Sequence, residues 1–417
     1  MREMKDSGIE WVGQTPKGWE LRRAKTLFTQ RNSKGNEIEV LLSPTQKYGV
    51  VPQSQLEGVV QVKEDADLQM FKTVHKGDFV ISLRSFQGGF EYSLYEGVCS
   101  PAYQVFYPTS PICDTYYRYL FKSQSFISKM NNLTVGIREG KNIQYVDFAN
   151  SQIPVPPLAE QERIAAFLDA ECAEIDTVLE KTRASIEEYK KLKQAVITQA
   201  VTKGIRGDRP MKDSGIEWIG DIQKGWGSST IAQLCSQVKY KNTGLQEKNL
   251  LSLSYGKVKR KSIDTVEGLL PESFDGYNII EKDDIVLRLT DLQNDHTSLR
   301  VGLAEERGII TSAYLTIRNR SNICTKYLYY YLHSFDIAKG FYGMGAGVRQ
   351  GLNWDGVKWL KVLVPSVPEQ EHIVAFLDAE SEKLDALIAK KQQYLTEIEN
   401  YKKSLIYEYV TGKREVV

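Results

Sequence analysis

Two long stretches of the chain place apolar residues at steps of three and four and contain neither glycine nor proline, residues 158–203 and 369–411. Gly204 and Gly412 follow these stretches and prolines precede them, which is the usual punctuation of a helix. The spacing predicts two long helices with a coiled-coil seam. The predicted seam positions are Ile164, Leu168, Cys172, Ile175, Leu179, Thr182, Ile186, Tyr189, Leu192 and Val196 in the first helix, and Ile373, Leu377, Leu384, Leu387, Tyr394, Ile398, Tyr401 and Leu405 in the second.

The charges of these helices indicate how they pair. Residues 158–180 contain seven acids and one base, whereas residues 181–206 contain seven bases and two acids, and the second helix repeats the trend. This gradient suits the helix dipole, and it also favours antiparallel pairing, in which acidic beginnings face basic ends. At 1.5 Å per residue each helix measures roughly 65 Å. We therefore predict an antiparallel rod with a pseudo-twofold axis and the remaining domains at its opposite ends.

The segments between the helices have the pattern of an α/β mixture. Short β-prone runs occur at 37–43, 78–83 and 102–107 in the first segment, and at 249–253, 284–289 and 313–317 in the second. Each segment continues into a tyrosine-rich helical stretch, at 114–126 and 325–335. The tyrosines recur every three to four positions, so we expect them to pack a core rather than contact a ligand.

The chain repeats itself. MKDSGIEWVG at residues 4–13 returns as MKDSGIEWIG at residues 211–220, with nine of ten residues identical at an offset of 207. Further matches occur at offsets between 206 and 211, so a unit of about 208 residues is used twice. The ends of the two copies match well and their middles do not. Either the middles have simply drifted, or the ends perform one task twice while the middles perform two different tasks.

Composition limits the possible classes of protein. The 417 residues are 41% hydrophobic and 26% charged, which is typical of a globular protein, and the formal net charge of +1 means that any basic surface is local. The five cysteines are scattered, which argues against a disulfide framework and a zinc site. No run of 18 apolar residues predicts a membrane span, and the N-terminus has no apolar signal core, so we expect a cytoplasmic protein.

One local basic surface is evident. Residues 239–261 contain seven bases and one acid, and the polar, aromatic segment 252–262 corresponds to segment 43–49 of the first copy. Segments 83–89 and 287–295 also correspond, and each combines arginine with glutamine or asparagine, the side chains that read guanine and adenine edges. Ordinary solvated loops are an equally open interpretation. The candidate DNA-binding residues are Lys47, Tyr48, Arg84, Ser85, Gln87, Ser254, Tyr255, Lys257, Lys259, Arg260, Arg288, Asp291 and Gln293, together with Arg138 and Arg349, whose flanking glycines are also compatible with a simple turn.

Catalytic motifs are not found. The glycine-rich segment 340–351 fits neither a P-loop nor a dinucleotide fingerprint. The NPPY or DPPY tetrapeptide of adenine methyltransferases does not occur, and none of the four histidines forms an HxxxH pair. We therefore expect no catalytic, cofactor-binding or metal-binding residues.

Several long motifs resemble those of the specificity subunits of type I restriction-modification systems. They are KDSGIEWVG followed by PKGW, and LAEQERIAAFLDAE with its twin PEQEHIVAFLDAE, and together they cover both halves of the chain. The resemblance implies an α+β architecture in which two α/β target recognition domains alternate with two long antiparallel coiled-coil helices, as a pseudo-twofold internal duplication. The implied boundaries are 1–157 and 207–366 for the recognition domains, and 158–206 and 367–417 for the helices.

The resemblance also implies a function. Such a subunit binds a bipartite, asymmetric sequence in double-stranded DNA, with one half-site for each recognition domain. It docks two modification subunits, which bind S-adenosylmethionine and methylate adenine, and restriction subunits join them; the specificity subunit is itself non-catalytic. Two alternatives remain, a coiled-coil scaffold whose two domains bind ligands other than DNA, and an enzyme with its own methyl-transfer activity.

Overall fold

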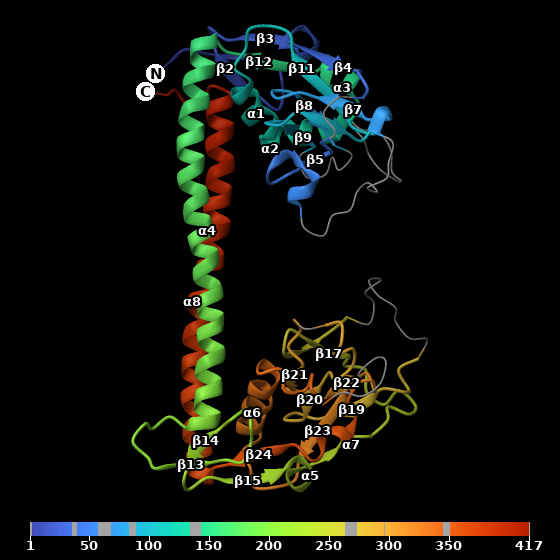
Figure 1. Ribbon diagram of the computed structural model, residues 1–417, viewed down its shortest axis with the longest axis vertical. Coiled ribbons are helices and arrows are strands. Elements are labelled where there is room, and N and C mark those ends of the chain that lie inside the picture. The colour runs from blue at the N-terminus through green and yellow to red at the C-terminus, as the bar shows by residue number, and fades with distance from the viewer. Residues whose placement is uncertain are drawn as a thin grey trace. The chain divides into compact units, whose positions relative to one another are not determined.

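The computed structural model describes residues 2–35, 40–56, 68–82, 89–133, 143–262, 273–295, 297–344 and 351–416 (Figure 1). The chain forms two compact units, one made of residues 1–183 and 393–417 and the other of residues 184–392. The two long helices are α4 (Leu158–Lys203) and α8 (Val367–Val410). Each unit contains one segment of α4 and one segment of α8.

The first unit is built around a four-stranded antiparallel sheet with the order β4-β11-β8-β9. Two-stranded antiparallel pairs surround it: β1 with β2, β3 with β12, β5 with β6, and β7 with β10. The described elements before α4 are β1 (Met4–Asp6), β2 (Gln14–Pro16), β3 (Glu20–Arg23), β4 (Phe28–Arg31), β5 (Leu42–Thr45), β6 (Gly49–Pro52), β7 (Lys72–Val74), β8 (Phe79–Ile81), β9 (Phe90–Tyr92), β10 (Gly97–Cys99), β11 (Gln104–Pro108), α1 (Asp114–Lys122), α2 (Gln124–Leu133), α3 (Tyr145–Asn150) and β12 (Gln152–Val155), with single 3-10 turns at Ala24–Thr26, Gln53–Gln55 and Leu68–Met70.

The second unit repeats this arrangement. Its four-stranded sheet has the order β16-β23-β20-β21, and its strand pairs are β13 with β14, β15 with β24, β17 with β18, and β19 with β22. The described elements between the long helices are β13 (Met211–Asp213), β14 (Asp221–Gln223), β15 (Gly227–Thr230), α5 (Ile231–Leu234), β16 (Cys235–Gln237), β17 (Leu251–Ser254), β18 (Lys257–Arg260), β19 (Asn278–Ile280), β20 (Ile285–Leu287), β21 (Val301–Leu303), β22 (Gly308–Ile310), β23 (Leu315–Asn319), α6 (Thr325–Ile337), α7 (Trp354–Val357) and β24 (Lys361–Val364). The predicted internal duplication and α+β class are confirmed, because the strand order of the two units is the same.

The β-prone runs mark the central sheets and one hairpin of each unit. The runs at 78–83 and 284–289 contain β8 and β20, and those at 102–107 and 313–317 overlap β11 and β23. The run at 249–253 overlaps β17, whereas its counterpart at 37–43 overlaps β5 only at its end, and residues 36–39 lie outside the described part. Segments 43–49 and 252–262 therefore lie in hairpins and are not simple solvated loops.

The drift in the repeat offset has a structural source. Strands β8 and β20 begin at Phe79 and Ile285, an offset of 206, whereas β9 and β21 begin at Phe90 and Val301, an offset of 211. The connection between the strands is therefore five residues longer in the second unit. This is the same pair of segments that the sequence suggested as base-reading loops.

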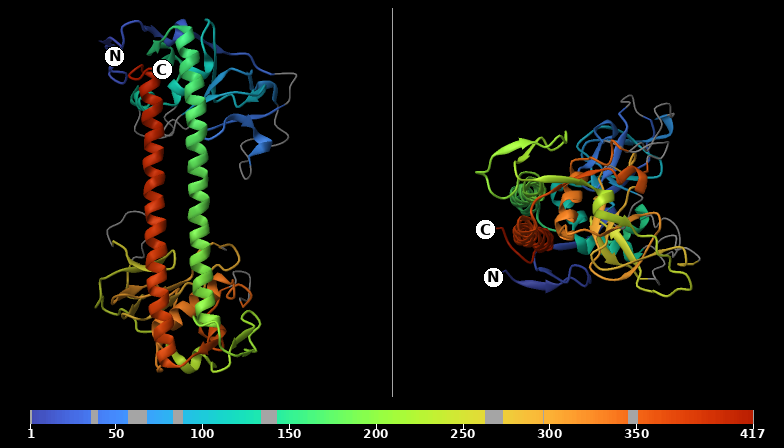
Figure 2. Two further views of the ribbon diagram at one scale, coloured as in Figure 1. Left: turned by 90° about the vertical axis from the view of Figure 1, so that its left-hand side faces the viewer. Right: turned by 90° about the horizontal axis from the view of Figure 1, so that it is seen from below.

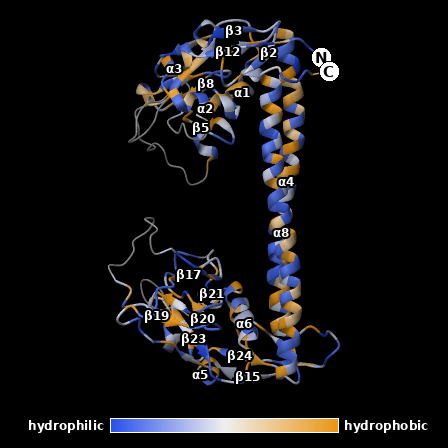
Figure 3. Ribbon diagram, turned by 180° about the vertical axis from the view of Figure 1, so that it is seen from behind, coloured by the Kyte–Doolittle hydropathy of each residue, from blue (hydrophilic) through white to orange (hydrophobic). Residues whose placement is uncertain are grey.

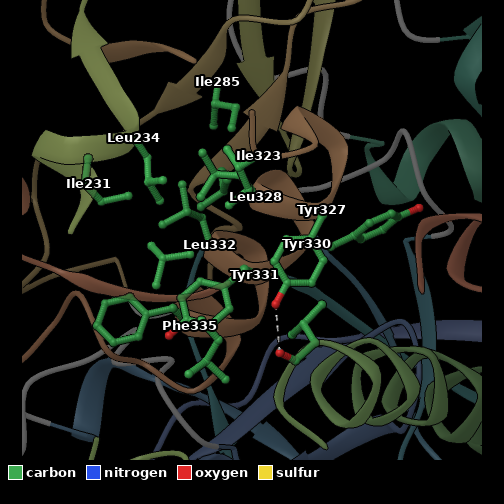
Figure 4. Close-up of a cluster of buried hydrophobic side chains, with 14 of the residues drawn as sticks. Ile231, Leu234, Ile285, Ile323, Tyr327, Leu328, Tyr330, Tyr331, Leu332 and Phe335 are labelled. Atoms are coloured by element: carbon green, nitrogen blue, oxygen red, sulfur yellow. Dashed lines mark hydrogen bonds between the residues drawn. The ribbon is translucent and has the colours of Figure 1, made fainter. Parts of the chain in front are cut away.

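The tyrosine-rich helices form the core of each unit, as predicted. Tyr116 and Tyr117 of α1 are fully buried, and so are Tyr327 and Tyr331 of α6. The predicted helix at 114–126 is interrupted, because Ser123 is extended between α1 and α2. Figure 4 shows the α6 side chains packed among leucines and isoleucines, with the Tyr327 hydroxyl donating to the carbonyl of Val201 in α4 at 3.4 Å. The core of the unit therefore holds the end of the long helix.

Within each unit the segments of α4 and α8 lie side by side and run in opposite directions (Figure 2). In the first unit, Phe167 stacks on Tyr409, with ring centroids 4.4 Å apart, and Arg183 pairs with Glu399 at 2.6 Å. Moving forward along α4 thus means moving backward along α8. In the second unit, Lys193 pairs with Asp385 at 2.7 Å. The predicted antiparallel pairing is confirmed by these contacts.

The predicted seam is partly wrong. Positions from Ile164 to Ile186 in the first helix are buried, but Leu192 is 48% exposed. In the second helix, Leu387, Tyr394 and Tyr401 are exposed as well, while the neighbours Ile388 and Leu395 are partly buried. Apolar and polar residues are interspersed along both helices in Figure 3. Steps of three and four allow two adjacent stripes, and in the middle of α8 the partly buried residues Ile388 and Leu395 lie on the stripe next to the predicted one.

Candidate nucleic-acid interface

Each unit presents a hairpin with an exposed tyrosine at its turn. Tyr48, between β5 and β6, is 60% exposed, and Tyr255, between β17 and β18, is 88% exposed. Tyr255 and Gly256 both have positive φ, of 48° and 74°, as a two-residue type I′ hairpin turn requires. A left-handed tyrosine is uncommon, and this turn directs a large aromatic side chain into solvent. Each tyrosine is followed by a glycine with positive φ, Gly49 or Gly256, but the first turn has three residues between its strands and the second has two.

The first hairpin is attached to the rest of its unit. Lys122 of α1 donates to the carbonyl of Gln46 in the turn at 3.3 Å, and its ammonium pairs with Glu91 at 2.5 Å. Burial raises the pKa of Glu91 to about 7, although the neighbouring Lys122 opposes this effect. Lys47 lies over the ring of Tyr48, 4.9 Å from its centroid. The turn therefore exposes a cation and an aromatic ring, and its backbone is held by a hydrogen bond to α1.

Strand β18 carries the positive charge of the second hairpin. Lys257 and Lys259 are exposed and form no ion pair with any described residue. Arg260 differs from them, because its guanidinium binds both carboxylate oxygens of Glu306, with Nε at 2.7 and 2.9 Å. This contact raises the pKa of Arg260. Ser254 is exposed at the end of β17. The two lysines are thus available for phosphates, whereas Arg260 already has an anionic partner.

Besides the β17–β18 hairpin, the β20–β21 connection of this unit also exposes polar side chains. Asp291 and Gln293 are exposed, while the nearby Leu289 and Leu292 are each 1% exposed. Arg288 lies 3.7 Å from Asp295, so its charge is partly compensated. Alternation of buried leucines with polar residues presents the polar side chains on one surface. The structure therefore brings Arg288, Asp291 and Gln293 together on a single loop.

Five of the candidate residues lie outside the described part of the chain. They are Arg84, Ser85, Gln87, Arg138 and Arg349. The base-reading loop predicted for the first unit is among them, so the candidate interface of that unit rests on Lys47 and Tyr48.

A hollow of about 480 Å³ lies beside the second hairpin. Tyr255 and Lys257 of the hairpin line it, and so do Lys190 of α4 and His333 of α6. His333 is 9% exposed, its Nδ1 has no hydrogen-bond partner among the described residues, and burial lowers its pKa to about 4. A neutral imidazole therefore forms part of the wall, and the charges around it are mixed, because Glu305 and Asp385 line the hollow as well.

Among the described residues, no group of three or more histidines, cysteines or carboxylates is placed to hold a metal ion. No helix in this part of the chain has the length and hydropathy needed to span a bilayer. What the exposed groups offer is electrostatic and hydrogen-bonding contact. Lysines that face solvent bind phosphates, and arginine, glutamine and aspartate side chains recognise base edges.

One structurally important residue has no distinguishing pattern in the sequence. Arg300, just before β21, is fully buried beneath the β20–β21 connection. Arginine is rarely buried completely, so its position in a polar segment suggested exposure. The burial of Arg300 could have been suspected from the longer connection in the second copy, because the backbone carbonyls of a longer loop need hydrogen-bond donors.

These features define a class of protein in which one chain contains two copies of a mixed helix–sheet unit. Each copy has a hairpin with an exposed tyrosine and contains one segment of each long helix. Residues 16–188 match the family described as type I restriction modification DNA specificity domain. The resemblance that the repeated motifs predicted is confirmed: this chain is similar in sequence and in fold to type I restriction-modification specificity subunits.

Curated relatives match over most of the chain. A specificity subunit assigned to the type I restriction enzyme MjaX of Methanocaldococcus jannaschii is 23% identical and covers 97% of this chain and 96% of its own length. The type I restriction enzyme MjaVIII specificity subunit of the same organism is 24% identical over 67% of this chain and 66% of its own. The StySPI specificity subunit of Salmonella potsdam is 23% identical over 73% and 66%, respectively.

Solved structures share the fold. A chain from a structure of the type I R-M system aligns with a TM-score of 0.69 and 15% identity, covering 96% of this chain and 99% of that one. The HsdS subunit from Thermoanaerobacter tengcongensis aligns with a TM-score of 0.50 and 16% identity, covering 96% and 98%. At these identities the likeness concerns the fold alone.

Proposed function

We propose that this chain is the DNA-reading specificity subunit of a type I restriction-modification complex. Each unit contacts one half of a bipartite, asymmetric sequence in double-stranded DNA. The exposed lysines supply affinity through phosphates, and the polar side chains of the loops supply sequence preference. Because the matched family is a DNA specificity domain, a scaffold directed at other ligands is not favoured.

The observation that carries this proposal is the contrast between a repeated scaffold and unlike exposed residues. Both units have the same strand order and an exposed tyrosine in the turn of the corresponding hairpin. The surroundings differ: the second unit has a lysine-bearing strand and a connection that is five residues longer. Two units with identical DNA-contacting residues would favour a symmetric DNA site. Two units that share a fold but expose different residues favour an asymmetric site.

The partners form a further part of the proposal. Two modification subunits dock on the paired helices, bind S-adenosylmethionine and methylate adenine, and restriction subunits join this assembly. The chain itself takes no cofactor and catalyses no step. The helices act as a spacer that sets the number of unread base pairs between the half-sites, as spacing does in dimeric DNA readers. The segments of α4 and α8 support this role by pairing in both units.

A binding experiment tests the proposal. The chain, with its modification subunits, is mixed with a pool of random duplexes over a salt series, and the bound sequences are read. We expect enrichment of two separated sequence blocks and a steep loss of affinity with salt, because phosphate contacts release counterions. Salt-independent binding, or enrichment of no sequence, contradicts DNA reading. Methyl transfer by the purified chain alone would contradict the non-catalytic assignment.

A further inference from the structure

The side chain of Arg300 is fully buried and is surrounded by backbone carbonyls. Its Nη1 donates to the carbonyls of Arg288 and Thr290, at 3.0 and 2.8 Å. Its Nη2 donates to the carbonyl of Asp291 at 3.3 Å and also to that of Asp295. Four carbonyls of one connection thus converge on a single guanidinium, whose planar fork matches several acceptors at once.

Two further groups complete this environment. Tyr342 accepts from Arg300 Nε at 3.1 Å, and its hydroxyl lies 3.0 Å from the carbonyl of Asp295, within hydrogen-bonding distance. Asp336 accepts from the Arg300 backbone amide at 2.6 Å. Placing a charge inside a protein is costly unless polar groups replace the lost water. Here the loop carbonyls are the main replacement, so the arginine and the loop conformation stabilise each other.

The same arrangement determines which way the loop faces. Its carbonyls point inward to Arg300, and Leu289 and Leu292 fill the core at 1% exposure. Asp291 has a positive φ of 55°, which turns the chain at this point, and its carboxylate accepts from Asn294 at 2.7 Å. The exposed side chains are those of Thr290, Asp291, Gln293 and Asn294. The inward carbonyls therefore leave the polar side chains on the outer surface.

This network of hydrogen bonds between Arg300 and the β20–β21 connection occurs in the second unit. At the offset of 211 that applies here, position 300 corresponds to Gly89, which lies just before β9 and has no side chain to bind a loop. The extra residues of the β20–β21 connection and the arginine that supports them thus occur together in one unit. A feature that distinguishes two otherwise equivalent units is a candidate for what makes their half-sites different.

We propose that Arg300 is a positioning residue for sequence recognition. It contacts no DNA itself, and it fixes the backbone of residues 288–295 so that Arg288, Asp291 and Gln293 meet base edges in a defined order. This inference rests on the proposed DNA-reading function. Base contacts made through two hydrogen bonds need accurate placement, so a loosened loop loses discrimination between bases before it loses attraction to phosphates.

The test compares three variants in the complete complex with modification subunits. Arg300→Lys keeps the charge and loses the fork. Tyr342→Phe removes one hydrogen bond to Arg300 and one to the carbonyl of Asp295, and it serves if Arg300→Lys does not fold. Arg307→Lys is the matched control, because Arg307 is exposed and pairs with Glu247 and Glu281 on the surface. Each complex is measured against duplexes that carry every single-base change in each half-site, and circular dichroism checks the fold.

We expect Arg300→Lys to lower discrimination at one half-site about tenfold, to leave the other half-site unchanged, and to speed hydrogen exchange of amides 288–295. Tyr342→Phe has the same effect to a smaller degree, and Arg307→Lys has none. Equal weakening on all duplexes, with base preferences intact, assigns Arg300 a purely stabilising role and overturns the inference. A wild-type complex without any half-site preference instead contradicts the proposed function, and the exchange measurement then still decides whether Arg300 holds the loop.

Discussion

Lys402 of α8 donates to both carboxylate oxygens of Asp176 of α4, at 2.6 and 2.7 Å, in the first unit. The second unit contains the same contact with the helices exchanged, because Lys193 of α4 donates to both oxygens of Asp385 of α8, each at 2.7 Å. Both acids lie in the acidic beginning of one helix and both lysines in the basic end of the other. The charge gradient read from the sequence thus corresponds to matched ion pairs across antiparallel helices.

Reversing one charge of this pair tests the pairing. Asp176→Lys places two lysines together, so we expect the free energy of unfolding of the first unit to fall, and the double variant with Lys402→Asp to regain about 0.2–1 kcal/mol. Urea unfolding at low salt measures both. Glu174→Lys is the matched control, because Glu174 is exposed on the same helix without an ion-pair partner in the described chain. If Asp176→Lys and the control Glu174→Lys lower the free energy of unfolding equally, and adding Lys402→Asp restores none of the loss, the pairing is contradicted.

The lysines of β18 should control the salt dependence of DNA binding. Replacing Lys257 and Lys259 with alanine removes two phosphate contacts, so the slope of log affinity against log salt should become shallower by about 1.8, with all duplexes weakened alike. Arg260→Ala is the control in the same strand, and we expect a smaller change, because Glu306 already binds that guanidinium. A gel-shift titration at several salt concentrations measures the slope. An equal effect of Arg260→Ala would show that the ion pair opens on DNA.

Glu91 should make the first unit less stable as the pH rises. Burial raises the pKa of this carboxyl from 4.5 to about 7, so the folded state holds its proton more tightly than the unfolded state. Its contribution is therefore fully present below pH 4.5 and is lost as the pH rises through 7. We expect the free energy of unfolding of wild type, relative to Glu91→Gln, to decline between pH 5 and pH 8. Denaturant unfolding at each pH measures the difference, and Glu3→Gln, at an exposed site, is the control. A constant difference would show that Lys122 keeps Glu91 ionised throughout.

The spacer role of the helices predicts the effect of lengthening them. One heptad inserted after Arg183 in α4 and one before Gln393 in α8 adds about 10 Å, which is the rise of about three base pairs. We expect the unread gap to grow by about that number while both half-sites stay the same. Methylation mapping of the variant complex reads both quantities together. A changed half-site with an unchanged gap is incompatible with the spacer role.

The sequence predicted the fold well where its signals were periodic or repeated. The helix bounds at Leu158 and Lys203 follow from proline before and glycine after the run, and Gly204 indeed has a positive φ of 81°. The duplicated strand order follows from the repeat. Seam positions such as Tyr394 and Tyr401 failed because periodicity gives the spacing of a stripe and not which of two neighbouring stripes is covered.

The candidate interface was predicted less completely. Tyr48 and Tyr255, each followed by glycine, can be matched by aligning the two copies, but their places in two hairpin turns of different length cannot be found in this way. The ion pair of Arg260 with Glu306 joins residues 46 positions apart, and no local pattern reveals such a partner. Arg300 escaped for a related reason, because its burial depends on carbonyls that only the folded loop brings together.

The most direct test of the account is methylome sequencing of a host that expresses this chain together with its modification subunits. We predict adenine methylation at a sequence of two unlike half-sites separated by a fixed number of unread base pairs, absent when the chain is omitted. In the same experiment, exchanging residues 251–303 for those of a relative should change one half-site only. A continuous or symmetric methylated sequence, or methylation that does not depend on this chain, would contradict the claim that two unlike units read two halves of one site.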